Sequence, residues 1–220
     1  MTTFTTSEPI TAVLDLPAGA IQLVAAEQTE TTVEVKPADP SKKRDVSAAE
    51  EAQVGYADGV LTVQVKAKNQ YFGPSGYVAV SVQLPTGSAV EVRAASAQLK
   101  AVGRYGDFTV ESSHGAIDLE DVASAKLTTS AGDIAVGRLH GPAEIRTSAG
   151  DIRIAEATRG DVVLRTDAGA IEIVAATGAS ATLDAGTASG RISNSLKNSG
   201  NADLNIKATT SVGDIIAASL

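Results

Sequence analysis

Apolar residues on the two sides of a recurring glycine keep a fixed separation along most of this sequence. The six residues TSAGDI occur twice, at residues 129–134 and 147–152. The separation is seven positions for Val92 and Leu99, Val110 and Ile117, Leu127 and Ile134, Ile145 and Ile152, and Leu164 and Ile171, and nine for Leu183 and Ile192 and for Ile206 and Ile215. The first members advance by 17 to 23 residues, a period typical of repeat architectures.

Each repeat reads as two short strands joined by a corner. Apolar and polar residues alternate over residues 143–147 and again over residues 152–154, the pattern of strands with one buried face. The tetrad Ser-Ala-Gly-Asp lies between them. Because glycine adopts positive φ and aspartate or serine can hydrogen-bond nearby main chain, this tetrad is expected to turn the chain without a helix.

A period near 18 residues is too short for a strand-helix-strand crossover, which needs about 30 residues. We therefore predict an all-β fold, a single-stranded parallel β-solenoid resembling a β-helix, with coils of 17–23 residues that rise by about 4.8 Å. Two interior columns are expected, one of Leu127, Ile145 and Leu164 and one of Ile134, Ile152 and Ile171. An antiparallel β-sandwich of successive hairpins is the alternative, but identical corners in the same phase favour the solenoid.

Residues 1–89 are less regular and are expected to form an N-terminal β cap on a solenoid of residues 90–220. Residues 33–35, 61–65 and 78–82 alternate as strands without a common period. Residues 37–53 are charged and contain prolines, which predicts a long exposed loop or a short amphipathic segment.

Several of these features resemble a known bacterial family. They are the GDI-type corners at Gly132, Gly150 and Gly213, residues 84–87 (LPTG) followed by residues 90–92 (VEV), and residues 19–21 (GAI). Together they resemble the putative-adhesin family of uncharacterised β-strand-repeat (GDI-repeat) proteins, over nearly the whole chain. The resemblance implies a β-strand-repeat fold, and the family's name implies adhesion.

Composition and charge narrow the class of partner. Of the 220 residues, 43% are hydrophobic and 3% aromatic, and the formal net charge is −8. We expect no binding to nucleic acid or to a membrane surface, because both depend on concentrated lysine and arginine. The chain has no cysteine, which excludes thiolate metal sites and thiol nucleophiles. With no signal peptide or apolar membrane span in the sequence, the expected location is cytoplasmic, with the cell surface as the alternative.

Motifs for catalysis and cofactor binding are missing from the sequence. There is no P-loop, dinucleotide-binding glycine motif or HExxH, and His114 and His140 lie at predicted corners without a G-x-S-x-G elbow. We expect no catalytic residue, cofactor or metal. The leading hypothesis is a non-catalytic scaffold or protein-interaction module. The alternatives are a surface adhesin or carbohydrate-binding protein, and an enzyme of unknown class.

Stacked repeats turn single surface residues into columns. Asp133 beside Asp151 at the corner suits either capping of the main chain or shared calcium binding. Capping is favoured because alanines interrupt the column and the glycine-rich nine-residue spacing of calcium β-rolls is missing. On an outward face, Arg153 beside Glu172 is expected to form a cross-strand ion pair.

The candidate interaction surface consists of Arg146, Arg165, Tyr71 and Phe72. The two arginines would be like-charged neighbours, which is unfavourable unless an anion intervenes, and Glu144 and Asp161 are the expected carboxylates. Residues 69–77 hold three of the seven aromatic residues, and aromatic residues on a loop can anchor a partner protein. Packing of this loop over the open end of the solenoid is the alternative.

Self-association is expected at the C-terminal end of the solenoid. The final coil would leave an unpaired strand edge, with Ile206, Ile215, Ile216 and Leu220 as the candidate residues. We predict a homodimer or an end-to-end oligomer of this chain. A protein partner of unknown identity is expected in addition. The polar residues 193–201 provide an alternative, since they could fold across the end and shield it.

Overall fold

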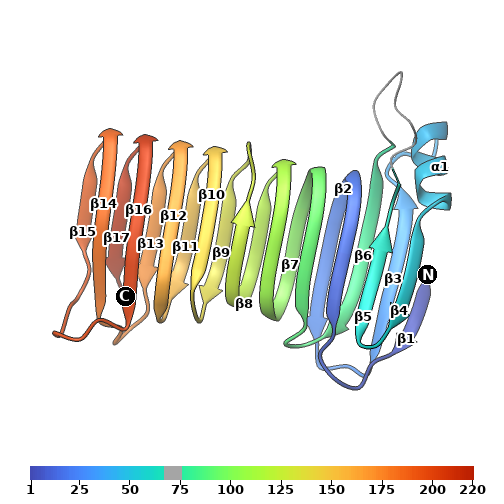
Figure 1. The fold of residues 1–220 in the computed structure, drawn as a ribbon, viewed down its shortest axis with the longest axis horizontal. Coiled ribbons are helices and arrows are strands. Elements are labelled where there is room, and N and C mark those ends of the chain that lie inside the picture. The colour runs from blue at the N-terminus through green and yellow to red at the C-terminus, as the bar shows by residue number, and fades with distance from the viewer. Residues whose placement is uncertain (67–75) are drawn as a thin grey trace. The chain divides into compact units, whose positions relative to one another are not determined.

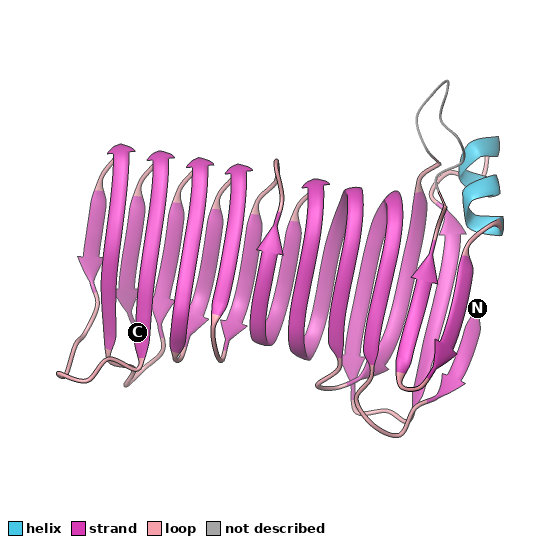
Figure 2. Cartoon of the chain, viewed as in Figure 1, coloured by secondary structure: helices cyan, strands magenta, loops and turns pink. Residues whose placement is uncertain are grey.

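The computed structural model describes residues 1–66 and 76–220, most of which lie in β-strands (Figures 1 and 2). The chain divides into two compact units, Met1–Gly115 and Ala116–Leu220, called unit 1 and unit 2 below. The predicted all-β, β-solenoid-like fold is confirmed. The antiparallel sandwich is wrong, because the strand pairs of unit 2 are parallel. No helix in the described ranges has the length and hydropathy to traverse a lipid bilayer.

Unit 2 is a stack of coils, each of which places one strand in each of two layers. Its strands are β8 (Ile117–Thr128), β9 (Ile134–Leu139), β10 (Ala143–Ala149), β11 (Ile152–Ala157), β12 (Gly160–Ala168), β13 (Ile171–Ala175), β14 (Ala181–Ser189), β15 (Ile192–Ser195), β16 (Leu204–Val212) and β17 (Ile215–Ser219). In one layer, β10 pairs with the second half of β8 and with β12. In the other layer, β11 pairs with β9 and β13.

Both predicted interior columns are present in unit 2. Leu127, Ile145 and Leu164 are register partners in one layer, and Ile134, Ile152 and Ile171 are register partners in the other. All six side chains are buried. Burial of one such side chain contributes about 1.5–3 kcal/mol, so the columns are a main source of stability for the stack.

The coils of unit 2 do not stack in the order of the sequence. Strand β16 lies between β12 and β14, and β17 lies between β13 and β15 (Figure 1). The last coil of the chain is therefore inside the stack, and the coil of β14 and β15 forms its end. The unpaired edge predicted at Ile206, Ile215, Ile216 and Leu220 is wrong for this reason. Ile206 and Ile215 are buried between two coils, whereas Ile216 and Leu220 are exposed.

Unit 1 also contains a strand inserted out of sequence order. Its elements are β1 (Thr2–Thr5), β2 (Thr11–Ala26), β3 (Glu30–Pro37), α1 (Lys43–Glu50), β4 (Gln53–Ala57), β5 (Val60–Gln64), β6 (Val78–Pro85) and β7 (Ala89–His114). Strand β2 pairs in parallel with β5 and β6 on one edge and with β7 on the other. Parallel coils thus already include β2, and the predicted boundary between residues 89 and 90 does not coincide with the division between the units.

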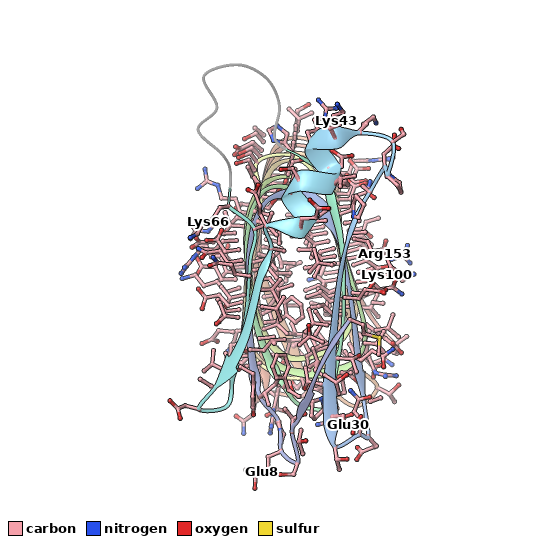
Figure 3. All side chains as sticks on the ribbon, turned by 90° about the vertical axis from the view of Figure 1, so that its right-hand side faces the viewer. Glu8, Glu30, Lys43, Lys66, Lys100 and Arg153 are labelled. Carbon is pink, nitrogen blue, oxygen red and sulfur yellow. The ribbon has the colours of Figure 1, made fainter. Side chains whose placement is uncertain are left out.

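Antiparallel strands close one end of unit 1. Strand β3 pairs with β1 and β6, and β4 forms a hairpin with β5. The rings of Phe4 and Tyr56 lie 5.5 Å apart. Within residues 37–53, helix α1 is the short segment, one of the two predicted alternatives. Its buried Asp45 carboxylate accepts a hydrogen bond from the main-chain N–H of Tyr77. In Figure 3, Lys66 and Lys100 point outward on opposite sides of this unit.

Candidate interaction surface

Two arginines lie side by side on the outward face of the layer that contains β10 and β12. Arg146 and Arg165 are register partners in these parallel strands, as predicted. Their side chains are 53% and 63% exposed. Neighbouring strands are about 4.8 Å apart, so the two arginines extend from adjacent positions on a continuous sheet.

Each arginine pairs with a carboxylate of its own strand. Glu144 lies 2.6 Å from Arg146, as predicted. Asp161, the other expected carboxylate, does not pair with either arginine but accepts a hydrogen bond from the Asn205 amide. Asp167 lies 3.8 Å from Arg165 instead. The second pair is long, so the guanidinium of Arg165 keeps much of its hydrogen-bonding capacity.

The outward face of the other layer carries the predicted ion pair. Arg153 and Glu172 are register partners in β11 and β13, with 3.6 Å between Nε and the carboxylate. Both side chains are exposed, and exposed pairs of this kind contribute about 0.2–1 kcal/mol. Arg153 thus has its carboxylate on the neighbouring strand, whereas Arg146 and Arg165 have theirs on their own strands and lie beside each other.

Aspartates at three of the corners link neighbouring coils. Asp133 accepts a hydrogen bond from the Asp151 N–H (2.9 Å), and Asp151 accepts one from the Ala170 N–H (2.7 Å). The predicted corner capping is confirmed. Asp214 accepts one from the Arg191 N–H (2.8 Å), although Arg191 comes earlier in the sequence, because the final coil is inserted before the coil of β14. This N–H and, secondly, the guanidinium of Arg191 hold the pKa of Asp214 below its ordinary value.

Threonines bond to corner glycines of neighbouring coils, a role that the sequence analysis missed. The hydroxyl of Thr166 donates to the carbonyl of Gly150 in the neighbouring coil (3.0 Å), and that of Thr210 donates to the carbonyl of Gly169 (3.0 Å). The available signal was a threonine three residues before the corner glycines Gly132, Gly150, Gly169, Gly190 and Gly213. Among the described residues, no group of three or more acidic or histidine side chains is arranged to hold a metal ion.

A buried carboxylate in unit 2 also escaped the sequence analysis. Asp121 is only 5% exposed and lies 2.8 Å from Arg138 Nε in the paired strand β9. This contact raises the pKa of Arg138. The other oxygen, Oδ1, accepts no hydrogen bond of good geometry, although His140 Nε2 lies 3.0 Å away. The contact with His140 therefore becomes an ion pair only when the imidazole is protonated.

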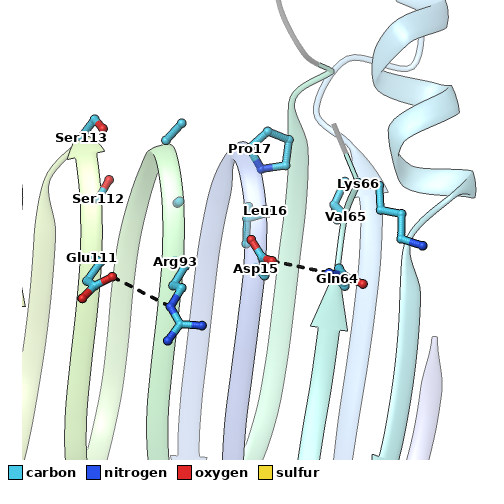
Figure 4. Close-up of a pocket in the computed structure, with 12 residues that line it drawn as sticks. Asp15, Leu16, Pro17, Gln64, Val65, Lys66, Arg93, Glu111, Ser112 and Ser113 are labelled. Carbon is cyan, nitrogen blue, oxygen red and sulfur yellow. Dashed lines mark hydrogen bonds and ion pairs between the residues drawn. The ribbon is translucent and has the colours of Figure 1, made fainter. Parts of the chain in front are cut away.

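Unit 1 carries a shallow outward groove of about 730 Å³ that crosses neighbouring strands (Figure 4). Gln64 donates to Asp15 across 3.5 Å, and Arg93 lies 3.9 Å from Glu111. Gln64 is a neutral donor to the Asp15 carboxylate, and Arg93 is paired with an acidic side chain, so the groove carries charges of both signs. Lys66 at its rim precedes residues 67–75, and the predicted interaction residues Tyr71 and Phe72 lie outside the described residues.

Comparisons with known proteins place this fold in a family. The family model for Toastrack DUF4097 matches residues 13–219. No curated protein matches the chain.

Similar crystal structures include two proteins described as putative adhesins. One is from Parabacteroides distasonis ATCC 8503, with a TM-score of 0.46 and 13% identity over 100% of this chain and 95% of that chain. The other is from Bacteroides fragilis NCTC 9343, with a TM-score of 0.45 and 13% identity over 98% of this chain and 95% of that chain. The family match spans nearly the whole sequence, and the chain belongs to the Toastrack DUF4097 family.

Proposed function

We propose that this protein is a non-catalytic interaction module that binds a protein partner through the outward face of β10 and β12. The observation that carries the proposal is the register pairing of Arg146 with Arg165. Like charges directly opposite each other on a sheet are destabilising. Glu144 and Asp167 offset part of this cost, and a carboxylate-bearing partner offsets more of it because its anions reach both exposed guanidinium groups.

The geometry of the face suits a protein partner with acidic side chains. Arginine forms bidentate hydrogen bonds with carboxylates and is enriched among residues that dominate binding energy at protein interfaces. The main chains of β10 and β12 are paired on both edges, which limits their motion and reduces the entropy lost on binding. Nucleic acid does not fit, because the chain carries a net charge of −8 and phosphate binding requires a basic surface.

Affinity capture from the native cell with matched variants tests this function. Wild type, the double variant Arg146→Ser/Arg165→Ser and the control Arg153→Ser would be immobilised separately, and captured proteins would be crosslinked and identified by mass spectrometry. Arg153 is exposed and lies on the opposite face, so it controls for loss of a surface arginine.

We expect one partner to be captured by wild type and by Arg153→Ser, and at least about tenfold less of it by the double variant, which corresponds to about 1.4 kcal/mol. Circular dichroism must show the same melting temperature for all three proteins. Equal capture by the double variant would overturn the proposed surface. The absence of any reproducible partner of wild type would overturn the function.

A further inference from the structure

The end of the stack in unit 2 leaves core residues uncovered. Ile192 is 47% exposed, whereas Ile215, its neighbour in the same interior column, is fully buried. Leu183 is partly exposed, although its register partner Ile206 is buried. Both differences arise because β14 and β15 have a coil on one side only. Further strands placed beside β14 and β15, at the open end of the stack, would remove both side chains from water.

Beyond Ala181, whose N–H and carbonyl bond to the loop after β15, the outer edge of β14 presents unpaired main chain. In the described part of the chain, β14 pairs with β16 alone and β15 with β17 alone. The N–H of Ala181 donates to the carbonyl of Lys197, in the loop after β15 (3.0 Å), and so points away from β16. Because the hydrogen-bonding groups of successive strand residues alternate in direction, those of Leu183, Ala185 and Thr187 also point away from β16.

We propose that this end binds a second copy of the chain by antiparallel pairing of β14 with β14 around a two-fold axis at Ala185. Ala185 then exchanges hydrogen bonds with Ala185 of the second copy, and Leu183 does so with Thr187 of the second copy. The edge is self-complementary, as a two-fold interface requires. The proposal is independent of the partner surface on β10 and β12.

Charge at this end favours contact between identical copies. Residues 181–203 contain Asp184, Asp203, Arg191 and Lys197, which is two negative and two positive charges and a net charge of zero. The whole chain has a net charge of −8. In the proposed register, Asp184 lies opposite Gly186 of the second copy, so no like charges are directly paired.

A closed dimer fits this end better than a filament of parallel coils. In the preceding coil, Asp214 accepts the N–H of Arg191, but the end coil has Arg191 in place of an aspartate. A further parallel coil would therefore lack this corner acceptor. In unit 1, the outermost strands β1 and β4 are short and antiparallel to their neighbours, so they do not continue the parallel coil pattern either.

Sedimentation velocity from about 1 µM to about 100 µM tests the proposal with three variants. Ala185→Pro removes an N–H that points away from β16, and proline is tolerated at sheet edges. Ile192→Lys places a charge on β15, at the same open end of the stack. Ile216→Lys is the matched control, because Ile216 is 44% exposed, close to the 47% of Ile192, but its side chain lies on the outward face of β17.

We expect wild type and Ile216→Lys to reach twice the chain mass of 22.2 kDa, and Ala185→Pro and Ile192→Lys to stay monomeric with unchanged circular dichroism. Amide exchange at Leu183, Ala185 and Thr187 should slow as the concentration of wild type rises. A monomeric wild type, growth beyond the dimer, or loss of dimer in Ile216→Lys alone would each overturn the proposal. Protection of these amides only by a different protein would do the same.

Discussion

The corner glycine Gly150 provides a direct test of how the coils stack. Its φ is +147°, and a Cβ at this position would lie 2.2 Å from the carbonyl oxygen of Gly132 in the adjacent coil. The obstacle is main chain, so Gly150→Ala must push two coils apart. A side chain in this backbone region costs about 1–3 kcal/mol. The displacement also weakens the bonds from Thr166 to Gly150 and from Asp151 to Asp133, each worth about 1 kcal/mol.

The expected loss for Gly150→Ala is therefore about 3–5 kcal/mol of unfolding free energy. Urea denaturation followed by far-ultraviolet circular dichroism measures it. Gly178→Ala is the matched control, because Gly178 also has a positive φ (+83°) but a Cβ there would meet nothing within 4 Å. The control should lose only about 1 kcal/mol from its backbone conformation. If Gly150→Ala is no less stable than Gly178→Ala, the close coil contact is refuted.

Three further substitutions probe the core and the charged contacts. Ile152→Asp should prevent cooperative folding of unit 2, because it loses about 1.5–3 kcal/mol of burial and buries an unpaired carboxylate; a circular-dichroism melting curve like that of wild type would contradict this. Arg138→Ala should cost about 1–3 kcal/mol in urea titrations, because it leaves the Asp121 carboxylate buried without its donor, and adding Asp121→Ala should restore part of the loss. In Arg191→Ala, NMR titration should find the pKa of Asp214 still below its ordinary value, because the main-chain N–H is the larger cause and remains. Since the folded pKa is lowered, this contact stabilises the protein above the unfolded pKa of about 4, and unfolding curves at decreasing pH should show the contribution disappearing.

Much of the local structure could be predicted because the same pattern of residues recurs along the sequence. The interior columns, the corner aspartates and the pairing of Arg146 with Arg165 all follow from a period of 17–23 residues and from the alternation of strand side chains. To predict these features, it is enough to assume that equivalent positions of neighbouring repeats stack on one another. The contact of Asp121 with Arg138 was accessible in principle, because the two residues are one coil apart, but its burial depends on the bend of β8 between the layers.

The sequence alone therefore determined what one coil looks like and which side chains face inward. Only the tertiary structure decided the order of the coils, because nearly identical corners can stack on either neighbour. The insertion of β16 and β17 before β14 and β15, and of β2 between β6 and β7, depends on pairing between residues far apart in the chain. That long-range choice also decided which strand edge is left open.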